Sequence, residues 1–195
     1  ENKSFLNYQA DFPVGNIMLA DYNLQEGDYV SAVKNYLRGL KKDSLMNYAR
    51  LNLSAAYNSV GKNAEALRTL QDALKIDPSN ERIYYNLGLL YYEMKDVARA
   101  SENFQKSIDM GSSDLGLYYN YGLLLQQLKK TREAEKVLLN GYALSPNSER
   151  INFALSYFYL EQQLPEKAMK HALVLQSLNA GNPEYQPIFK ALGLI

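Results

Sequence analysis

The chain has 195 residues, with 21 Lys+Arg against 21 Asp+Glu, so its formal net charge is zero. A chain without net charge has no overall field that would hold a polyphosphate, and this predicts that nucleic acid is not a partner. The absence of cysteine excludes disulfides, thiolate metal sites, iron–sulfur clusters and cysteine nucleophiles.

The first 12 residues are predicted to be a leader or the end of a preceding helix, because Phe5 and Leu6 fall where such a helix would carry its last apolar residues. The chain begins with Glu1 rather than Met, which predicts an excised piece of a longer protein. No stretch approaches the ~18 consecutive apolar residues of a membrane span, so membrane insertion is not expected. The sequence leaves open whether the protein lies in the cytoplasm or the periplasm of a bacterium.

From residue 13 onwards the chain matches itself at an offset of 34 residues. The segment 84–90 returns as 118–124 with six of seven residues identical. One column of this register holds only alanine, namely Ala32, Ala66, Ala100, Ala134 and Ala168. The repeat predicts five units within 13–182, with the boundaries 13–46, 47–80, 81–114, 115–148 and 149–182.

Each unit has the apolar spacing of two helices. In the second unit, helical spacing predicts helices over 48–60 and 64–76, separated by Gly61 as a stop and Asn63 as a cap. The segment 77–80, Asp-Pro-Ser-Asn, then breaks the chain and caps the next helix. No segment alternates with a period of two, so strands have no support and the fold class is all-α.

A second column holds only small residues, Ala20, Ser54, Gly88, Gly122 and Ser156. We expect it to face the alanine column of the second helix, because two helices approach closely only where side chains are small. One such pair cannot bury both of its apolar faces, so the pairs must stack as a solenoid. Residues 183–195 are predicted to form a C-terminal capping helix over the last unit.

This pattern resembles the tetratricopeptide repeat over residues 13–182. The features that carry the likeness are the 34-residue helix–turn–helix, adjacent Leu and Gly in the first helix with Tyr three residues later, and Ala early in the second. The resemblance implies a right-handed solenoid of five units plus the cap. The family's Trp position departs from the pattern, since it is held by Asn16, Arg50, Tyr84, Tyr118 and Asn152.

The first helix of each unit has a second apolar side, seen in the i, i+4, i+7 spacing of Tyr85, Leu89 and Tyr92. In the family this side lines a concave surface that binds peptides or helices. The resemblance implies that the partner-binding residues are Tyr48, Leu51, Asn52, Arg82, Tyr85, Asn86, Leu89, Tyr92, Tyr119, Asn120, Leu123, Gln126, Arg150, Phe153 and Tyr157. The same surface would also hold Val14, Ile17, Asp21, Leu24, Ala55, Asn58 and Leu160.

Such a groove would bind through the rigid apolar faces of Tyr and through its Asn column, Asn52, Asn86 and Asn120, whose amides can pair with the backbone of a bound strand. Some relatives clamp the terminal carboxylate of chaperone tails with an inner-face Lys and Asn. Here those two positions read Ile17 and Asp21, Leu51 and Ala55, or Tyr85 and Leu89 in the first three units, so this clamp is absent.

No residue pattern indicates catalysis. His171 has no acid or nucleophile beside it in sequence and is predicted to be solvated. There is no Gly-rich phosphate loop and no metal-ligand spacing, so we expect no cofactor. The sequence therefore predicts a non-catalytic scaffold that binds a protein or peptide in a concave groove lined by Tyr, Leu and Asn.

The alternative is an accessory repeat module of a larger enzyme or multihaem electron-transfer protein. The run 124–128 and the terminal helix bear a weak resemblance to the repeat tails of bacterial multihaem cytochromes, although the chain has no haem-binding Cys.

Overall fold

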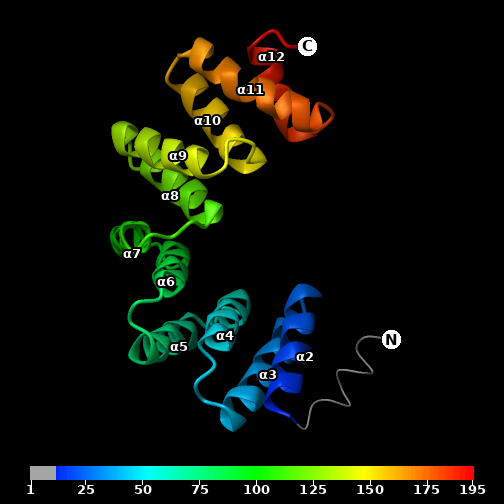
Figure 1. Cartoon of the computed structure of the whole chain (residues 1–195), viewed down its shortest axis with the longest axis vertical. Helices are drawn as coiled ribbons and strands as arrows, with labels where there is room; N and C mark the ends of the chain where they lie inside the picture. Colours follow the sequence, from blue (N-terminus) through cyan, green and yellow to red (C-terminus); the bar gives the residue numbers. More distant parts are fainter. Residues whose placement is uncertain (1–11) are drawn as a thin grey trace. The chain divides into compact units, whose positions relative to one another are not determined.

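A computed structural model describes residues 12–195, where all regular structure is helical (Figure 1). The expectation for Phe5 and Leu6 lies outside these residues. The elements are α2 (Pro13–Gln25), α3 (Tyr29–Lys42), α4 (Asn47–Ser59), α5 (Asn63–Ile76), α6 (Glu81–Glu93), α7 (Val97–Asp109), α8 (Leu115–Gln127), α9 (Thr131–Leu144), α10 (Glu149–Glu161), α11 (Pro165–Asn179), the 3₁₀ turn η2 (Pro183–Tyr185) and α12 (Gln186–Ala191). The predicted all-α class is confirmed.

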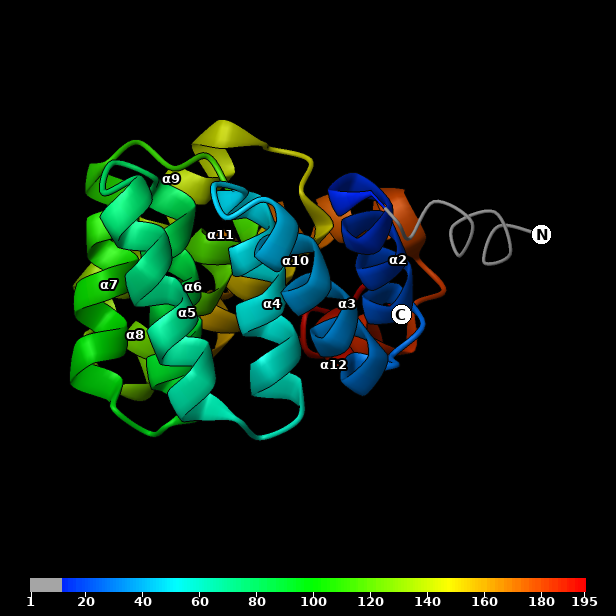
Figure 2. The ribbon, with the colours of Figure 1, turned by 90° about the horizontal axis from the view of Figure 1, so that it is seen from below.

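The chain divides into two compact units, with the boundary after Gly111. The described part of the N-terminal unit holds α2 to α7, and the C-terminal unit, Ser112–Ile195, holds α8 to α12. Within each unit the helices pair in sequence, and the second helix of a pair also contacts the first helix of the next, as α3 does with α4 and α9 with α10. Figure 2 shows α4 to α7 as consecutive neighbours in the N-terminal unit.

The first helices of the five pairs begin 34 residues apart, as the repeat predicts. Local signals fix these ends. The Asn80 side chain caps α6 by accepting from the Arg82 N–H over 3.2 Å, and Gly61 leaves α4 with a φ of +74° that favours glycine. The predicted cap Asn63 is wrong. It is the first residue of α5, and Lys62 precedes it without a side-chain cap.

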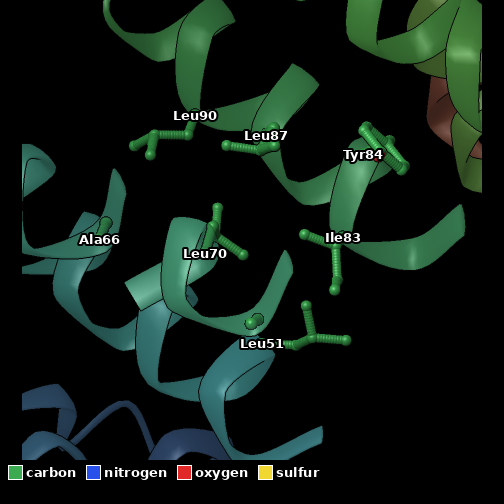
Figure 3. Packing of buried hydrophobic residues seen from close by; sticks show 8 residues of the cluster. Leu51, Ala66, Leu70, Ile83, Tyr84, Leu87 and Leu90 are labelled. Carbon is green, nitrogen blue, oxygen red and sulfur yellow. The ribbon is translucent and has the colours of Figure 1, made fainter. Parts of the chain in front are cut away.

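Apolar side chains from successive helices fill the core of the N-terminal unit. Leu51 of α4, Leu70 of α5 and three residues of α6, Ile83, Leu87 and Leu90, point into one cluster (Figure 3). Each of these five is at most 5% exposed. Since a fully buried Leu or Ile stabilises a fold by about 1.5–3 kcal/mol relative to exposure, this cluster holds the consecutive pairs together.

Large side chains of the partner helix pack against the two glycines of the small-residue column. A Cβ added to Gly88 would overlap the ring of Phe104, and one added to Gly122 would overlap the side chain of Leu138. Phe104 and Leu138 lie one turn after the alanines Ala100 and Ala134, and both are buried. The small column is therefore the space into which the large residue of the partner helix fits.

The departures at the family's Trp position have a structural role. Tyr84, Tyr118 and Asn152 each donate a side-chain hydrogen bond to the main-chain carbonyl oxygen six residues earlier, over 3.1, 2.8 and 2.8 Å respectively. The acceptor in each case belongs to the loop that joins two helix pairs. These three side chains satisfy a loop carbonyl that no helix supplies with a partner.

His171 is buried at 3% exposed, so the prediction that it is solvated is wrong. Its Nδ1 lies 2.9 Å from Oδ1 of Asn152, whose amide nitrogen already donates to two carbonyls. Since that leaves Oδ1 as an acceptor, Nδ1 carries the proton and donates. The ring stacks on Tyr159 at 5.9 Å, and burial lowers the pKa of His171 to about 4.

The C-terminal segment forms η2 and α12 after the Asn182 side chain accepts from the Glu184 N–H over 3.0 Å. Its buried Tyr185, Ile188 and Phe189 form one cluster with Ala172 and Leu175 of α11. These contacts cover apolar surface that the last helix pair would otherwise expose.

Candidate functional site

The first helices of neighbouring pairs contact one another within each unit. In the N-terminal unit α4 contacts both α2 and α6, and in the C-terminal unit α8 contacts α10. These helices carry all the residues predicted to bind a partner. The placement of Leu51 on the binding surface is wrong, because Leu51 is only 3% exposed and belongs to the core. The same holds for Ile17, which is 1% exposed. The other fourteen predicted binding residues are half-buried or exposed.

In the N-terminal unit, hydrogen bonds to Asp21 hold together the first part of this surface, between α2 and α4. Its carboxylate accepts hydrogen bonds from the hydroxyl of Tyr36, from the hydroxyl of Tyr48 at 3.0 Å and from the amide of Asn52 at 3.0 Å. Burial and the bond to Asp21 raise the pKa of Tyr48 to about 12, and the same causes raise that of Tyr36. Tyr48 and Asn52 thus tie α4 to α2, and these donors are engaged inside the unit.

The second part of the surface, between α4 and α6, offers little space. The amide of Asn86 donates to the carbonyl of Arg82 over 2.8 Å, and the Tyr85 ring lies 6.0 Å from that of Phe104. A cavity of about 60 Å³ remains there, lined by Ser54, Ala55, Asn58, Leu70, Asn86, Leu89 and Leu90. Ligand pockets usually measure roughly 300–1,000 Å³, so this cavity is much smaller than a usual ligand pocket.

The C-terminal unit contains a larger pocket of about 410 Å³. It is lined by Tyr119, Asn120, Glu149, Arg150, Phe153, Glu184 and Tyr185. The first helices α8 and α10 and the turn η2 contribute these residues. The structure therefore brings together four residues that the sequence predicted, and it adds Glu149, Glu184 and Tyr185.

The pocket has aromatic walls and a charged rim. Tyr185 is buried at 5% exposed, and its ring lies 5.5 Å from that of Phe153. Glu149, Arg150 and Glu184 are exposed at the rim. Burial and a hydrogen bond to the Glu149 carboxylate raise the pKa of Tyr185 to about 12, so its hydroxyl stays protonated at neutral pH.

The only arginine of the pocket lies against an aromatic ring. The Cζ of Arg150 is 5.5 Å from the centroid of the Tyr119 ring, a distance at which a cation is attracted to the ring face. The remaining predicted residues of this unit are not among the residues that line the pocket. The Gln126 amide donates to Glu161 over 3.2 Å, Tyr157 is 49% exposed, and Leu123 is half-buried.

This arrangement is suited to binding. Within residues 12–195, no group of three or more His, Cys, Asp or Glu side chains could hold a metal ion. In the same range, no helix combines the length and apolar character that crossing a membrane requires. The pocket offers aromatic faces, one amide and charges of both signs, which are the groups that recognise a polar or charged side chain.

Comparisons with known proteins identify the repeats. A family model described as "TPR repeat" matches residues 55–95, and one described as "Tetratricopeptide repeat" matches residues 81–110 and 115–148. The chain is 41% identical over 66 residues, 34% of its length, to "TPR repeat-containing protein MJ1428" of Methanocaldococcus jannaschii. The match covers 11% of that relative, so the chain spans only a small part of its length.

Solved structures share the fold at low sequence identity. The structure of PilF of Pseudomonas aeruginosa matches with a TM-score of 0.81 and 17% identity, over 100% of this chain and 86% of that one. A thermophilic TPR protein of Thermus thermophilus, TTC0263, matches with a TM-score of 0.73 and 17% identity, over 94% of this chain and 100% of that one. YrrB, described as "a TPR protein with an unusual peptide-binding site", matches with a TM-score of 0.64 and 16% identity, over 96% of each chain.

Proposed function

Because the chain belongs to the tetratricopeptide repeat family, whose fold serves generally as a protein–protein interaction scaffold, we propose that it is a non-catalytic scaffold that binds a peptide or helix of another protein. The ligand lies on the surface formed by the first helices of the repeats. In the C-terminal unit this surface is α8 and α10, closed at one end by η2.

The pocket of the C-terminal unit is the observation that carries this proposal. Four of its seven lining residues, Tyr119, Asn120, Arg150 and Phe153, are residues that the repeat register assigns to the binding surface. A Tyr ring gives a rigid apolar contact with a polar edge, and an amide can pair with a peptide backbone. The peptide-binding site described for YrrB, a protein with the same fold, supports a ligand of this kind.

The test is selection of peptides from a displayed random library against the full chain, followed by calorimetric titration of a selected peptide. We expect Tyr119→Ala to weaken binding by roughly tenfold or more, because truncating an aromatic contact residue at the centre of an interface commonly costs over 1 kcal/mol. Tyr29→Ala is the matched control, since Tyr29 is an exposed tyrosine on α3, outside this surface.

Circular dichroism of both variants separates lost binding from lost folding. If the library yields no binder, or if Tyr119→Ala binds the selected peptide as tightly as the wild type does, the proposed surface is wrong. The second function predicted from the sequence, an accessory module of a larger enzyme or multihaem protein, gains no support from a particular contact in residues 12–195 and stays a prediction.

A further inference from the structure

We propose that the pocket of the C-terminal unit accepts a lysine or arginine side chain of the bound peptide. This inference rests on the proposed function and names the chemistry of the partner at that site. It follows from three features of the unit, which are the balance of charge on its binding surface, the aromatic walls of the pocket and the position of Arg150.

Carboxylates outnumber cations on this surface. Glu149 and Glu184 lie at the rim of the pocket, and Glu161 lies on the same surface, where it accepts from Gln126. Arg150 is the one cation among the residues that line the pocket. Since the whole chain is neutral, the negative balance is a local property of this surface, and it favours a positively charged ligand group.

The aromatic walls suit the same ligand. Tyr119, Phe153 and Tyr185 line a cavity of about 410 Å³, which is large enough for the aliphatic stem and the head group of a long side chain. A Lys or Arg side chain buries its methylene stem against apolar rings while its charged end reaches polar groups at the rim. The ring faces add attraction for the cation, which strengthens as water leaves the site.

Arg150 shows that a guanidinium can lie over an aromatic ring of this pocket. Its Cζ lies 5.5 Å from the centre of the Tyr119 ring, so a cation over an aromatic face is an arrangement that this site stabilises. If Arg150 instead served as the anchor for an anionic ligand, that ligand would have to approach past two rim carboxylates, Glu149 and Glu184. Like-charge approach of this kind is unfavourable.

The direct test uses a small probe and the full chain. In an NMR titration of the isotope-labelled protein, N-acetyl-arginine amide and N-acetyl-lysine amide should shift the backbone amide signals of Asn120, Phe153 and Tyr185. N-acetyl-norleucine amide, which has a neutral side chain of similar length, and N-acetyl-glutamate amide should shift them far less. Equal shifts with norleucine, preference for glutamate, or no shifts at these residues with either cation would overturn the inference.

Matched charge variants locate the effect. Glu184→Gln should weaken binding of the capped arginine about threefold, the size expected for a partly exposed ion pair, and Glu149→Gln with Glu184→Gln about tenfold. Glu166→Gln removes an equal charge from the exposed first turn of α11, outside the pocket, and should leave binding unchanged. Equal loss with Glu166→Gln would show unspecific attraction and overturn the inference.

The peptide library separates this inference from the proposed function. If selected peptides bind and require Tyr119 but show no preference for Lys or Arg, the inference fails and the proposed function stands. If the capped arginine occupies the pocket but the library yields no binder, the proposed function fails, while the preference of the pocket for a cation is supported.

Discussion

The two units place equivalent residues of the repeat register in different environments. In the C-terminal unit, Tyr119 and Asn120 of α8 line an open pocket. One and two repeats earlier the same asparagine position holds Asn86, which bonds to its own helix, and Asn52, which bonds to Asp21. The surroundings of the asparagine position therefore differ from one repeat to the next.

Two neighbours account for the difference. Asp21 places a carboxylate where the later repeats have Ala55, Leu89, Leu123 and Tyr157, and this single acid draws three donors together in the N-terminal unit. In the C-terminal unit the segment after α11 adds Glu184 and Tyr185, which lie after the fifth repeat. Asp21 engages the polar groups around it in hydrogen bonds inside the unit, whereas the segment after α11 forms one wall of a pocket.

The largest loss of stability is expected in the N-terminal unit, where Asp21 accepts several hydrogen bonds from within the unit. Asp21→Ala should destabilise the N-terminal unit by about 3–4 kcal/mol, because it leaves the hydroxyl of the fully buried Tyr36 and two other donors without their acceptor. Urea unfolding, with hydrogen exchange over α2 to α4, would measure this. Glu184→Ala is the matched change in the open pocket and should cost below about 0.5 kcal/mol. Similar losses for both variants would remove the contrast between the units.

Acid should act on the C-terminal unit through His171. Its pKa in the folded chain, about 4, lies below the ordinary value of 6.5, so the unfolded chain binds the proton first as the pH falls. The contribution of neutral His171 to the free energy of unfolding is complete above pH 6.5, and about 2 kcal/mol of this free energy is lost by pH 5.

His171→Gln should remove the dependence of stability on pH between 6.5 and 5, even if it lowers stability throughout. The comparison is best made by hydrogen exchange over α10 and α11, with α4 to α6 as the reference, since the chain has no second histidine. An unchanged pH dependence in the variant would contradict the assignment. The carboxyls of Glu135, Asp77 and Asp96, whose pKa values are lowered by hydrogen bonds, affect stability only at lower pH.

The fold could be predicted from the sequence because its signals are local. Helix starts at Glu81 and Glu149 follow from apolar spacing and from the polar segments before them, and the offset of 34 repeats the helix starts along the chain. The site was predictable only in part. The repeat register places Tyr119 and Phe153 at fixed positions on first helices, and both line the pocket.

The remaining features depend on tertiary contacts that no local pattern encodes. The bond from Asn52 to Asp21 joins residues 31 positions apart. His171 is buried because α9 and α10 supply Tyr142 and Tyr159 around it, although its neighbours in sequence gave no such signal. Glu184 lines the pocket because the turn η2 brings it beside residues of α8 and α10. The sequence indicated only that a terminal helix begins there.

A smaller effect should be common to both units, because the helix pairs are built alike. Gly88→Ala and Gly122→Ala each add a Cβ that overlaps a buried side chain, Phe104 or Leu138. We expect each variant to lose about 1–2 kcal/mol of stability, since overpacking commonly costs 1–3 kcal/mol and alanine regains up to about 1 through helix propensity. Thermal unfolding would measure both losses.

Gly181→Ala is the control for this pair of variants, because its added Cβ meets nothing closer than 3.9 Å. It should stay within about 0.5 kcal/mol of the wild type. If Gly88→Ala destabilised the protein and Gly122→Ala did not, the pairs would differ in packing as well as in the polar chemistry of their surfaces.

The smallest effect concerns the hydroxyls that hold the loops between pairs. Tyr118→Phe removes the bond to the loop carbonyl six residues earlier, in the C-terminal unit, and Tyr84→Phe removes the equivalent bond in the N-terminal unit. Each should cost about 1 kcal/mol, because a loop carbonyl loses its donor while the ring keeps its packing. Hydrogen exchange should rise first in the loop that each hydroxyl holds, and Tyr29→Phe, at an exposed hydroxyl, should change nothing. Equal losses at Tyr84 and Tyr118 would show that the repeats share these loop contacts and differ only at the binding surface, whereas unequal losses would place part of the difference between the units in the loops themselves.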